Sequence, residues 1–384
     1  MQFVIPKSEL VRELLTVTGV VEKRATLPIL SNLLVQAREG AVHLRASDLE
    51  VNVRSKTPAT VVKEGSVALP AAKLLEIARS LPEAEVQFRL REGHHVEIHC
   101  ERTRYRLAGQ SVEEFPGFPT LEGHPAALPG RALRQMIERV QFAITTDDPR
   151  YSLNGALLLV DKGGLTLVAT DGHRLAFVQR EMSLDLPHGN SRAIVPRKTL
   201  SELLKLTAEL GDKDAVDYGR QGNHVFFRVG DRELASTVPD GPFPNYENVM
   251  PERCNISVVV ATHELSAAVR RVSLLASERL GKAVRFALSQ GKLELSFEGE
   301  VGQASEAVSV DYEGEDTEIG FNARYILEFL GVVGSERVRL ELDPVRSGDG
   351  KAHSDKPGDK PGLLRPEPDG GFDYRYIVMP MHLL

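Results

Sequence analysis

The sequence predicts an α+β fold that is built three times along one chain. Helical patterns occur in pairs, and the second helix of each pair begins at Pro70, Pro196 and Asn322, at an equal spacing of 126 residues. Hairpin signals with glycine at the turn lie between the helices. An equal period with matched patterns indicates internal repetition, and two helices with several short strands per repeat indicate helices packed on antiparallel sheet.

Each helix is predicted from apolar residues at a spacing of three or four, and several follow a proline in the opening turn. Leu10, Leu14 and Val17 form such a stripe in the first helix. The six predicted helices are 6–24, 71–80, 129–144, 196–209, 262–276 and 322–334.

Glycines mark the predicted hairpin turns. Gly40, Gly164 and Gly291 each precede a run of alternating apolar residues, and Gly93 and Gly222 mark further turns. Each repeat therefore reads helix, strands, helix, strands, with two helices on one face of the sheet.

The 384 residues are expected to form three domains, 1–124, 125–253 and 254–384. Segment 346–371 breaks the repeat because ten of its 26 residues are Gly or Pro and no apolar period runs through it. We expect a flexible inserted loop there, and a loop without function is the simpler interpretation.

Composition excludes several classes of protein. No apolar run reaches the roughly 18 residues of a membrane span, and the first residues lack the apolar stretch of a secretion signal, so a cytoplasmic protein is expected. Cys100 and Cys254 are the only cysteines, and no CxxC or zinc-finger histidine pair occurs. We expect no disulfide, no metal and no cofactor.

The net charge of −7 argues against nucleic acid as a partner when the chain is taken as a whole. The predicted helices nevertheless contain 15 basic and 9 acidic residues, a net charge of +6, and leave −13 for the remainder. If all six helices line one face, that face attracts phosphate backbones and the strand-rich exterior repels them. The helices lack base-reading motifs, so contact with the backbone is what remains. Chance is the alternative explanation of the split.

Seven segments, in order along the chain, form a recognisable set. They are Thr26-Leu27-Pro28-Ile29-Leu30, Ser47-Asp48-Leu49-Glu50, Tyr151-Ser152-Leu153-Asn154-Gly155, Ala169-Thr170-Asp171-Gly172-His173-Arg174-Leu175-Ala176, Ile194-Val195-Pro196-Arg197-Lys198, Phe243-Pro244-Asn245-Tyr246 and Met379-Pro380-Met381. Together these segments closely resemble one family, the bacterial DNA polymerase III beta subunit or sliding clamp. The resemblance covers essentially the whole chain apart from 346–371.

The resemblance implies three clamp-fold domains per chain and a ring-shaped, head-to-tail homodimer around double-stranded DNA, with helices inside and antiparallel sheets outside. It implies a processivity factor, without catalysis of its own, that tethers the replicative polymerase. The implied partners are DNA, the DNA polymerase III alpha subunit, the clamp loader, and other clamp-binding polymerases and repair proteins. Because the chain has no nucleotide-binding motif, loading is expected to need a separate ATP-driven opener.

By the same resemblance, the DNA-contacting residues are Arg24, Lys73, Arg150, Tyr151 and Ser152. The chain departs from the family here, because relatives carry Arg at the position of Ala72 and a second Tyr at that of Ser152. Lys73 is the candidate for the missing charge. For Arg24 a solvated cation at a helix end is the alternative.

Ring closure by resemblance pairs an edge strand that contains Tyr105 and Leu107 with the third-domain helix region at Leu274 and Leu275. Alternation in residues 104–107 places Tyr105 and Leu107 on one face, as a half-buried interface strand requires. Ordinary core packing is the alternative for the two leucines.

The chain ends in an apolar tail, residues 379–384, which contains no Lys, Arg, Asp or Glu. By resemblance the tail belongs to a groove for partner peptides, in which methionine adapts to several related anchors. Relatives commonly carry Arg at the positions of Asn248 and His382 and lack Leu384, so peptide preference is expected to differ. The groove residues are Leu153, Thr170, Gly172, His173, Arg174, Leu175, Pro244, Asn248, Val249, Val378, Met379, Pro380 and Met381.

Two rival functions remain at this point. Asp171 and His173 could form an acid–base pair in an enzyme, although no nucleophile elbow, phosphate loop or metal-ligand spacing accompanies them. A three-domain scaffold that binds peptides without encircling DNA is the second rival, and the mass in solution discriminates it from a ring.

Overall fold

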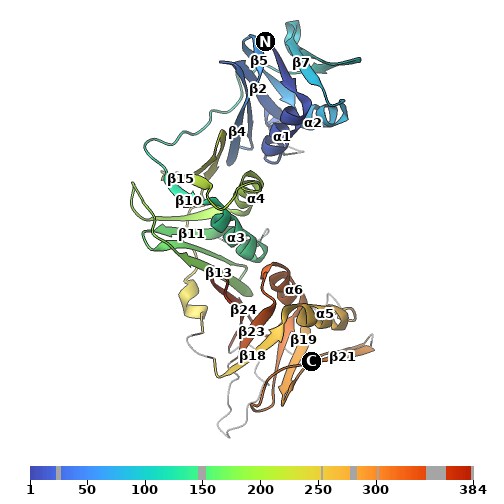
Figure 1. Cartoon of the computed structure of the whole chain (residues 1–384), viewed down its shortest axis with the longest axis vertical. Helices are drawn as coiled ribbons and strands as arrows, with labels where there is room; N and C mark the ends of the chain where they lie inside the picture. The colour runs from blue at the N-terminus through green and yellow to red at the C-terminus, as the bar shows by residue number, and fades with distance from the viewer. Residues whose placement is uncertain are drawn as a thin grey trace. The chain divides into compact units, whose positions relative to one another are not determined.

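The computed structural model of the chain describes residues 1–22, 27–145, 153–251, 254–276, 283–300, 302–342 and 360–381. The chain divides into two compact units (Figure 1), and each is described by itself. Unit 1 comprises Met1–Arg134 and Leu184–Pro239, and unit 2 comprises Gln135–Ser183 and Asp240–Leu384.

All six predicted helices are confirmed, although several end earlier than predicted. The first stops at Thr18, and Gly19 caps it. Val20 and Val21 continue the apolar spacing beyond this glycine, which explains why the sequence predicted a longer helix. The helices are α1 Lys7–Thr18, α2 Ala71–Ser80, α3 Gly130–Val140, α4 Arg197–Leu206, α5 Thr262–Val272 and α6 Ala323–Val332.

Unit 1 contains two antiparallel sheets. One has the strand order β5-β1-β7-β8-β9, and the other has the order β10-β15-β16-β17-β4-β3-β2-β6. The strands of unit 1 are β1 Gln2–Pro6, β2 Asn32–Arg38, β3 Ala41–Ser47, β4 Val51–Pro58, β5 Thr60–Lys63, β6 Gly65–Pro70, β7 Glu85–Leu90, β8 His95–Cys100, β9 Thr103–Ala108, β10 Ala126–Pro129, β14 Ser191–Pro196, β15 Ala215–Gln221, β16 His224–Val229 and β17 Arg232–Thr237.

Unit 2 also builds two sheets. Its strands pair in the orders β11-β12-β13-β25-β24-β23-β18 and β21-β20-β19-β22. The strands are β11 Gly155–Asp161, β12 Gly164–Thr170, β13 Arg174–Glu181, β18 Ile256–Ala261, β19 Ala283–Ser289, β20 Lys292–Gly299, β21 Gly302–Ser309, β22 Thr317–Asn322, β23 Arg337–Leu342, β24 Gly362–Glu367 and β25 Asp373–Val378.

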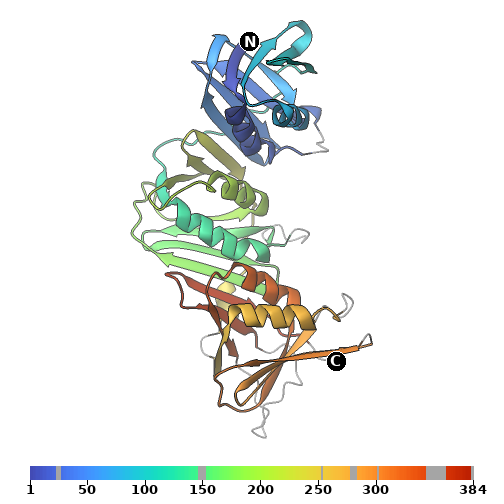
Figure 2. The same ribbon diagram turned by 45° about the vertical axis from the view of Figure 1, so that its right-hand side comes forward.

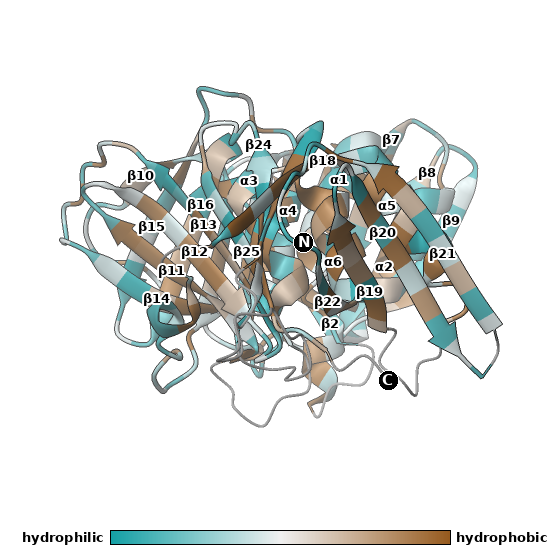
Figure 3. Ribbon diagram, turned by 90° about the horizontal axis from the view of Figure 1, so that it is seen from below, coloured by the Kyte–Doolittle hydropathy of each residue, from teal (hydrophilic) through white to brown (hydrophobic). Residues whose placement is uncertain are grey.

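Two pairs of helices pack against the sheets of their own unit. In unit 1, α1 contacts α2 and the sheet strands β3 and β4, and in unit 2, α5 contacts α6 and the strands β20 and β21 (Figure 2). Hydrophobic and hydrophilic residues alternate along strands such as β20 (Figure 3), because one face of the strand meets the core. Stacked rings of Phe329 and Tyr376, 5.0 Å between centroids, lie in the core of unit 2.

The prediction of a loop over the whole of 346–371 is wrong for part of that segment. Residues Gly362–Glu367 form β24, which pairs with β23 through Val338 and Pro366. Gly362 and Pro366 in this stretch hid the strand from the apolar pattern. Pro366 is tolerated because the pairing of β24 with β25 already ends at Leu364 and Tyr376, so no N–H is needed there.

Among the described residues, no helix has the length and apolar character to cross a membrane.

Candidate functional site

The turn between β12 and β13 is shaped by its own side chains. Asp171 Oδ1 accepts hydrogen bonds from the backbone N–H groups of His173, at 2.9 Å, and Arg174, at 3.1 Å. The Thr170 hydroxyl accepts from the N–H of Gly172 at 3.1 Å and donates to the carbonyl of Arg174 at 2.7 Å. Gly172 adopts a φ of 89°, a left-handed conformation that glycine reaches without strain. The turn thereby presents Gly172 and His173 to solvent.

Arg174 is buried at the base of this turn and every nitrogen of its guanidinium donates a hydrogen bond. Nε donates to Asp171 Oδ2 at 3.0 Å, and Nη2 donates to the carbonyl of Phe142 at 2.6 Å. Nη1 donates to Glu328 and reaches the Tyr376 hydroxyl at 3.5 Å. Burial alone would lower the pKa of Arg174, but the Tyr376 phenol and the Glu328 carboxylate raise it above its ordinary value. The charge is therefore permanent and internally neutralised.

These bonds change how two predicted residues are interpreted. All three nitrogens of the guanidinium are engaged within unit 2, so Arg174 acts as a positioning residue that ties the turn to Glu328 on α6 and to Phe142 in the short 3-10 helix after α3. Both carboxylate oxygens of Asp171 accept hydrogen bonds, Oδ1 from the backbone of the turn and Oδ2 from Arg174. An acid–base pair of Asp171 with His173 therefore has no free carboxylate oxygen to use.

The chain tail lies beside this turn. Strand β25 runs antiparallel to β13, with Val378 opposite Arg174. Beyond the strand, the N–H of Met379 donates to the carbonyl of His173 at 2.9 Å, and the N–H of Met381 donates to the carbonyl of Gly320 at 2.8 Å. Met379, Pro380 and Met381 are half-buried, so part of each side chain remains open to solvent.

The segment before β18 contributes the remaining predicted groove residues. A short 3-10 helix, Tyr246–Val249, is capped by the side chain of Asn245 and holds its aromatic ring 6.0 Å from that of Phe177 on β13. Pro244 and Asn248 are exposed, and the side chain of Val249 is 44% exposed. The exposed apolar Val249 is the kind of surface a docked peptide covers.

The structure thus brings most of the predicted groove residues together in unit 2. Hydrogen bonds and strand pairing join Thr170, Gly172, His173 and Arg174 to the tail at Met379. The ring contact of Tyr246 links the segment of Pro244, Asn248 and Val249 to the same strand, β13. Leu153, Leu175 and Val378 are buried in unit 2. Phe142, Glu328 and Tyr376, which hold Arg174, had no signal in the sequence because the fold alone brings them near.

Of the predicted DNA-contacting residues, only Lys73 falls among the described residues. It lies on α2 with its side chain 66% exposed, and its ammonium pairs with Glu76 at 2.7 Å. Such an exposed pair is weak, about 0–1 kcal/mol, and gives way easily to a phosphate. Arg24, Arg150, Tyr151 and Ser152 lie outside the described residues.

The predicted ring-closure residues lie at two sheet edges. Tyr105 and Leu107 are half-buried on β9, an edge strand in unit 1, and the Tyr105 hydroxyl lies 3.3 Å from Ser80 Oγ at the end of α2. Leu274, in unit 2, follows α5 and is 79% exposed, which rules out the alternative of core packing for this residue. Leu275 Cδ1 lies 3.7 Å from the position of a Cβ on Gly302, at the start of edge strand β21.

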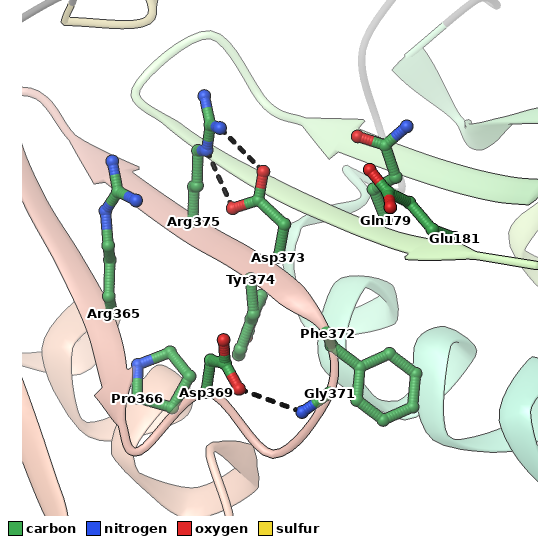
Figure 4. Close-up of a pocket in the computed structure, with 10 residues that line it drawn as sticks. All are labelled: Gln179, Glu181, Arg365, Pro366, Asp369, Gly371, Phe372, Asp373, Tyr374 and Arg375. Atoms are coloured by element: carbon green, nitrogen blue, oxygen red, sulfur yellow. Dashed lines mark hydrogen bonds and ion pairs between the residues drawn. The ribbon is translucent and has the colours of Figure 1, made fainter.

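A polar pocket of about 420 Å³ opens where β24 and β25 separate (Figure 4). Two of its charged groups, Arg375 and Asp373, pair with each other. Arg375 donates to both oxygens of Asp373, at 2.8 and 2.6 Å, and Asp369 accepts from the N–H of Gly371 at 3.0 Å. None of these residues was predicted as a site. The lining residues are Gln179, Glu181, Arg365, Pro366, Asp369, Gly371, Phe372, Asp373, Tyr374 and Arg375.

In the part of the chain that the structure describes, no three His, Cys, Asp or Glu side chains are grouped as ligands of a metal ion. The thiol of Cys100 is buried, and burial raises its pKa.

Three family models match the chain in order. They describe the N-terminal domain of the DNA polymerase III beta subunit, at residues 1–119, its central domain, at residues 127–245, and its C-terminal domain, at residues 247–348.

Similar proteins agree with these models over the full length. A beta sliding clamp of Pseudomonas putida is 35% identical over 390 residues, and one of Escherichia coli is 32% identical over 387 residues, each covering 100% of both chains. A crystal structure of the DNA polymerase III subunit beta from Pseudomonas aeruginosa matches with a TM-score of 0.88 at 34% identity, again over 100% of both chains.

Proposed function

The chain belongs to the DNA polymerase III beta subunit family, and from this premise we propose that it is a sliding clamp that encircles duplex DNA and tethers the replicative polymerase. The single observation that carries the proposal is the match of all three clamp domains over the chain's full length. The protein is a processivity factor and performs no catalysis itself. The six α-helices and the antiparallel sheets of the described residues are those expected of three α+β repeats.

We place the domains at 1–124, 125–253 and 254–384, and a head-to-tail pair of chains then supplies six such domains. A head-to-tail contact is safe only when it closes into a ring. The edge strands β9 and β21 offer the two halves of such a contact, because each has one row of unpaired backbone groups. β9 carries Arg104 and Arg106, whereas the carboxylate of Glu306 on β21 is already paired with Arg271.

Tyr105 and Leu107 on one edge would meet Leu274 and Leu275 beside the other. An apolar side chain exposed as fully as Leu274 gains most from this burial. The end of α2 and the end of α5 flank the two edges through Ser80 and Leu275 respectively, so each half of the contact is built from a strand and a helix end.

DNA would be held by shape and weak charge. The helices carry the chain's excess of basic residues, and the exposed cation Lys73 pairs at 2.7 Å with Glu76, which is exposed too. Exposed pairs exchange readily for phosphate oxygens, so the protein can slide without a tight fixed contact. Arg24, Arg150, Tyr151 and Ser152 complete the proposed contact set by family resemblance.

Partner peptides would dock at the surface formed by the turn at Gly172, the segment before β18 and the tail at Met379 and Met381. We call this surface, with the thirteen residues predicted above, the peptide groove. Its half-buried methionines and exposed Val249 suit short apolar anchors. The proposed occupants are the DNA polymerase III alpha subunit, the clamp loader, and other clamp-binding polymerases and repair proteins in the cytoplasm.

Primer extension by the cognate polymerase on a long circular template, with clamp loader and ATP, tests the function. Under conditions that allow one polymerase encounter per template, adding the protein should convert short products into long ones. Product lengths that do not change would contradict the proposal and favour a peptide-binding scaffold.

A further inference from the structure

The turn that presents Gly172 has a close counterpart in unit 1, at residues 47–51 between β3 and β4. The Ser47 hydroxyl accepts from the N–H of Leu49 at 3.0 Å, as the Thr170 hydroxyl does from Gly172 at 3.1 Å. Asp48 Oδ1 accepts from two successive N–H groups, those of residues 50 and 51, at 2.9 and 2.6 Å. Asp171 does the same for residues 173 and 174 at 2.9 and 3.1 Å.

The strands that follow the two turns are also paired alike. β4 pairs with β17, and Val51 lies opposite Ser236, while β13 pairs with β25, and Arg174 lies opposite Val378. The next residue continues the match in both places. The N–H of Thr237 donates to the carbonyl of residue 50 at 2.8 Å, as that of Met379 donates to His173 at 2.9 Å.

We call each combination of such a turn and the strand end beside it a joint. The two joints share one backbone design, in which a turn held by its own side chains lies against the end of a strand. They differ in what they present to solvent. Leu49 stands where the other turn has Gly172, and both are in the left-handed region, at φ of 78° and 89°. The side chain of Leu49 is 55% exposed. Thr237 stands where the peptide groove has Met379.

We propose that this one turn position decides which of the two joints accepts a partner peptide. Glycine at 172 leaves the outer surface of the turn bare, so a peptide can lie against the turn and the tail. Leucine at 49 places a side chain over the same part of the matching turn. The inference rests on the proposed peptide groove and deepens it by naming its specificity-determining residue.

The conformation of Leu49 supports this assignment. A leucine in the left-handed region is strained, because its Cβ crowds the following carbonyl. The surrounding bonds of Ser47 and Asp48, together with the ion pair of Asp48 with Lys198, hold the turn in this shape regardless. The same bonding pattern around Gly172 should therefore tolerate leucine without unfolding.

Gly172→Leu tests the proposal directly. The probe is a fluorescein-labelled short peptide with apolar anchors from the cognate alpha subunit, titrated with full-length protein and followed by fluorescence anisotropy. We expect the variant to melt within a few degrees of the wild type and to bind the peptide at least about tenfold more weakly. Binding within twofold of the wild type, by a folded variant, would overturn the proposal.

Leu49→Gly is the matched control, because it makes the reverse exchange in the duplicate turn. Because the side chain of Leu49 is proposed to close this joint, the variant should bind a second peptide per chain by calorimetry, whereas the wild type should bind one; a variant that still binds one would contradict the claim that this position alone decides. Two peptides per wild-type chain would overturn the proposal, since the Leu49 joint would then be open. A wild type that binds no peptide would refute the groove itself, whereas equal binding by wild type and Gly172→Leu would refute only the role of residue 172.

Discussion

The backbone N–H of Met379 donates to the carbonyl of His173 at 2.9 Å, and this bond fastens the chain tail to the turn that opens β13. It continues the pairing of β25 with β13 beyond the last strand residue, Val378. The tail is held by its backbone, so the side chains of Met379 and Met381 are left half-buried and available to a partner. A backbone held in place by hydrogen bonds, with adaptable methionine side chains on it, is a suitable binding surface for several related peptides.

Replacing both tail methionines with alanine should abolish peptide binding and leave the dimer intact. Met379→Ala with Met381→Ala removes the apolar anchors but keeps every backbone bond. We expect a loss of at least about tenfold in affinity, which is about 1.4 kcal/mol. Fluorescence titration measures the affinity, and light scattering measures the mass. Met182→Ala, a half-buried methionine elsewhere in unit 2, is the control and should bind normally. Unchanged affinity in the double variant would refute the groove.

Arg174→Ala should destabilise the protein and loosen the groove turn. The substitution leaves Glu328 and the Phe142 carbonyl without their shared donor and frees Asp171 from its ion pair. Breaking a buried pair in this way costs about 3 kcal/mol of the free energy of unfolding, measurable by urea denaturation. The more exposed pair of Arg375 with Asp373 provides the control, and Arg375→Ala should cost less than about 1 kcal/mol. Equal, small losses would contradict the positioning role of Arg174.

Leu274→Asp should convert the dimer into folded monomers. A charge placed on this 79% exposed side chain costs nothing in the free chain but would be buried without a partner in the closed ring. Light scattering should show half the wild-type mass, with an unchanged melting temperature and peptide affinity. Leu49→Asp changes another exposed leucine and should keep the dimer mass. A dimer that survives Leu274→Asp would show that the ring closes elsewhere.

The free energy of unfolding should fall as the pH drops below the pKa of an ordinary histidine, and His43 should contribute to this fall. Burial lowers the pKa of His43 first, and the positive charges of Arg38, Lys56 and Arg54 lower it further, against an opposing effect of Glu39. Between the lowered folded pKa and the ordinary value near 6.5, the unfolded chain binds more protons, so stability rises with pH.

The pH effect is measured as the urea midpoint at pH 7.5 and at pH 5.5. His43→Gln should reduce the difference between the two midpoints, whereas His263→Gln, which changes a side chain that is 82% exposed, should leave it as in the wild type. A difference that is the same in all three proteins would contradict the assignment to His43.

The repeat made the helices predictable. Each amphipathic stripe was present in three copies, so the existence of all six helices followed from the pattern. Their ends did not follow, because the apolar spacing passes through Gly19 and beyond Val140, where the backbone leaves the α-helix. Strand β24 was missed since Gly362 and Pro366 break the alternation that identifies a strand.

The candidate site was only partly visible in the sequence. The motif of residues 169–176 predicted the turn. It did not predict that the Asp171 carboxylate would bond the backbone of the turn or that Arg174 would be buried. Those outcomes depend on Phe142 and Glu328, which are far from the turn in sequence and come near only through the fold. The likeness of the turns at Leu49 and Gly172, by contrast, has a signal in the sequence, because Ser47-Asp48 and Thr170-Asp171 both place a hydroxyl residue before an aspartate.

Retention on DNA tests the central claim most directly. The protein is loaded onto a nicked circular plasmid with clamp loader and ATP, passed over a gel-filtration column in high salt, and compared with the same sample after one restriction cut. Confinement by a closed ring predicts that the protein travels with the circle despite the salt and is released once the plasmid is linear. Loss from the circle in high salt, or equal retention on both forms, would show that contact strength holds the protein on DNA and would contradict the account.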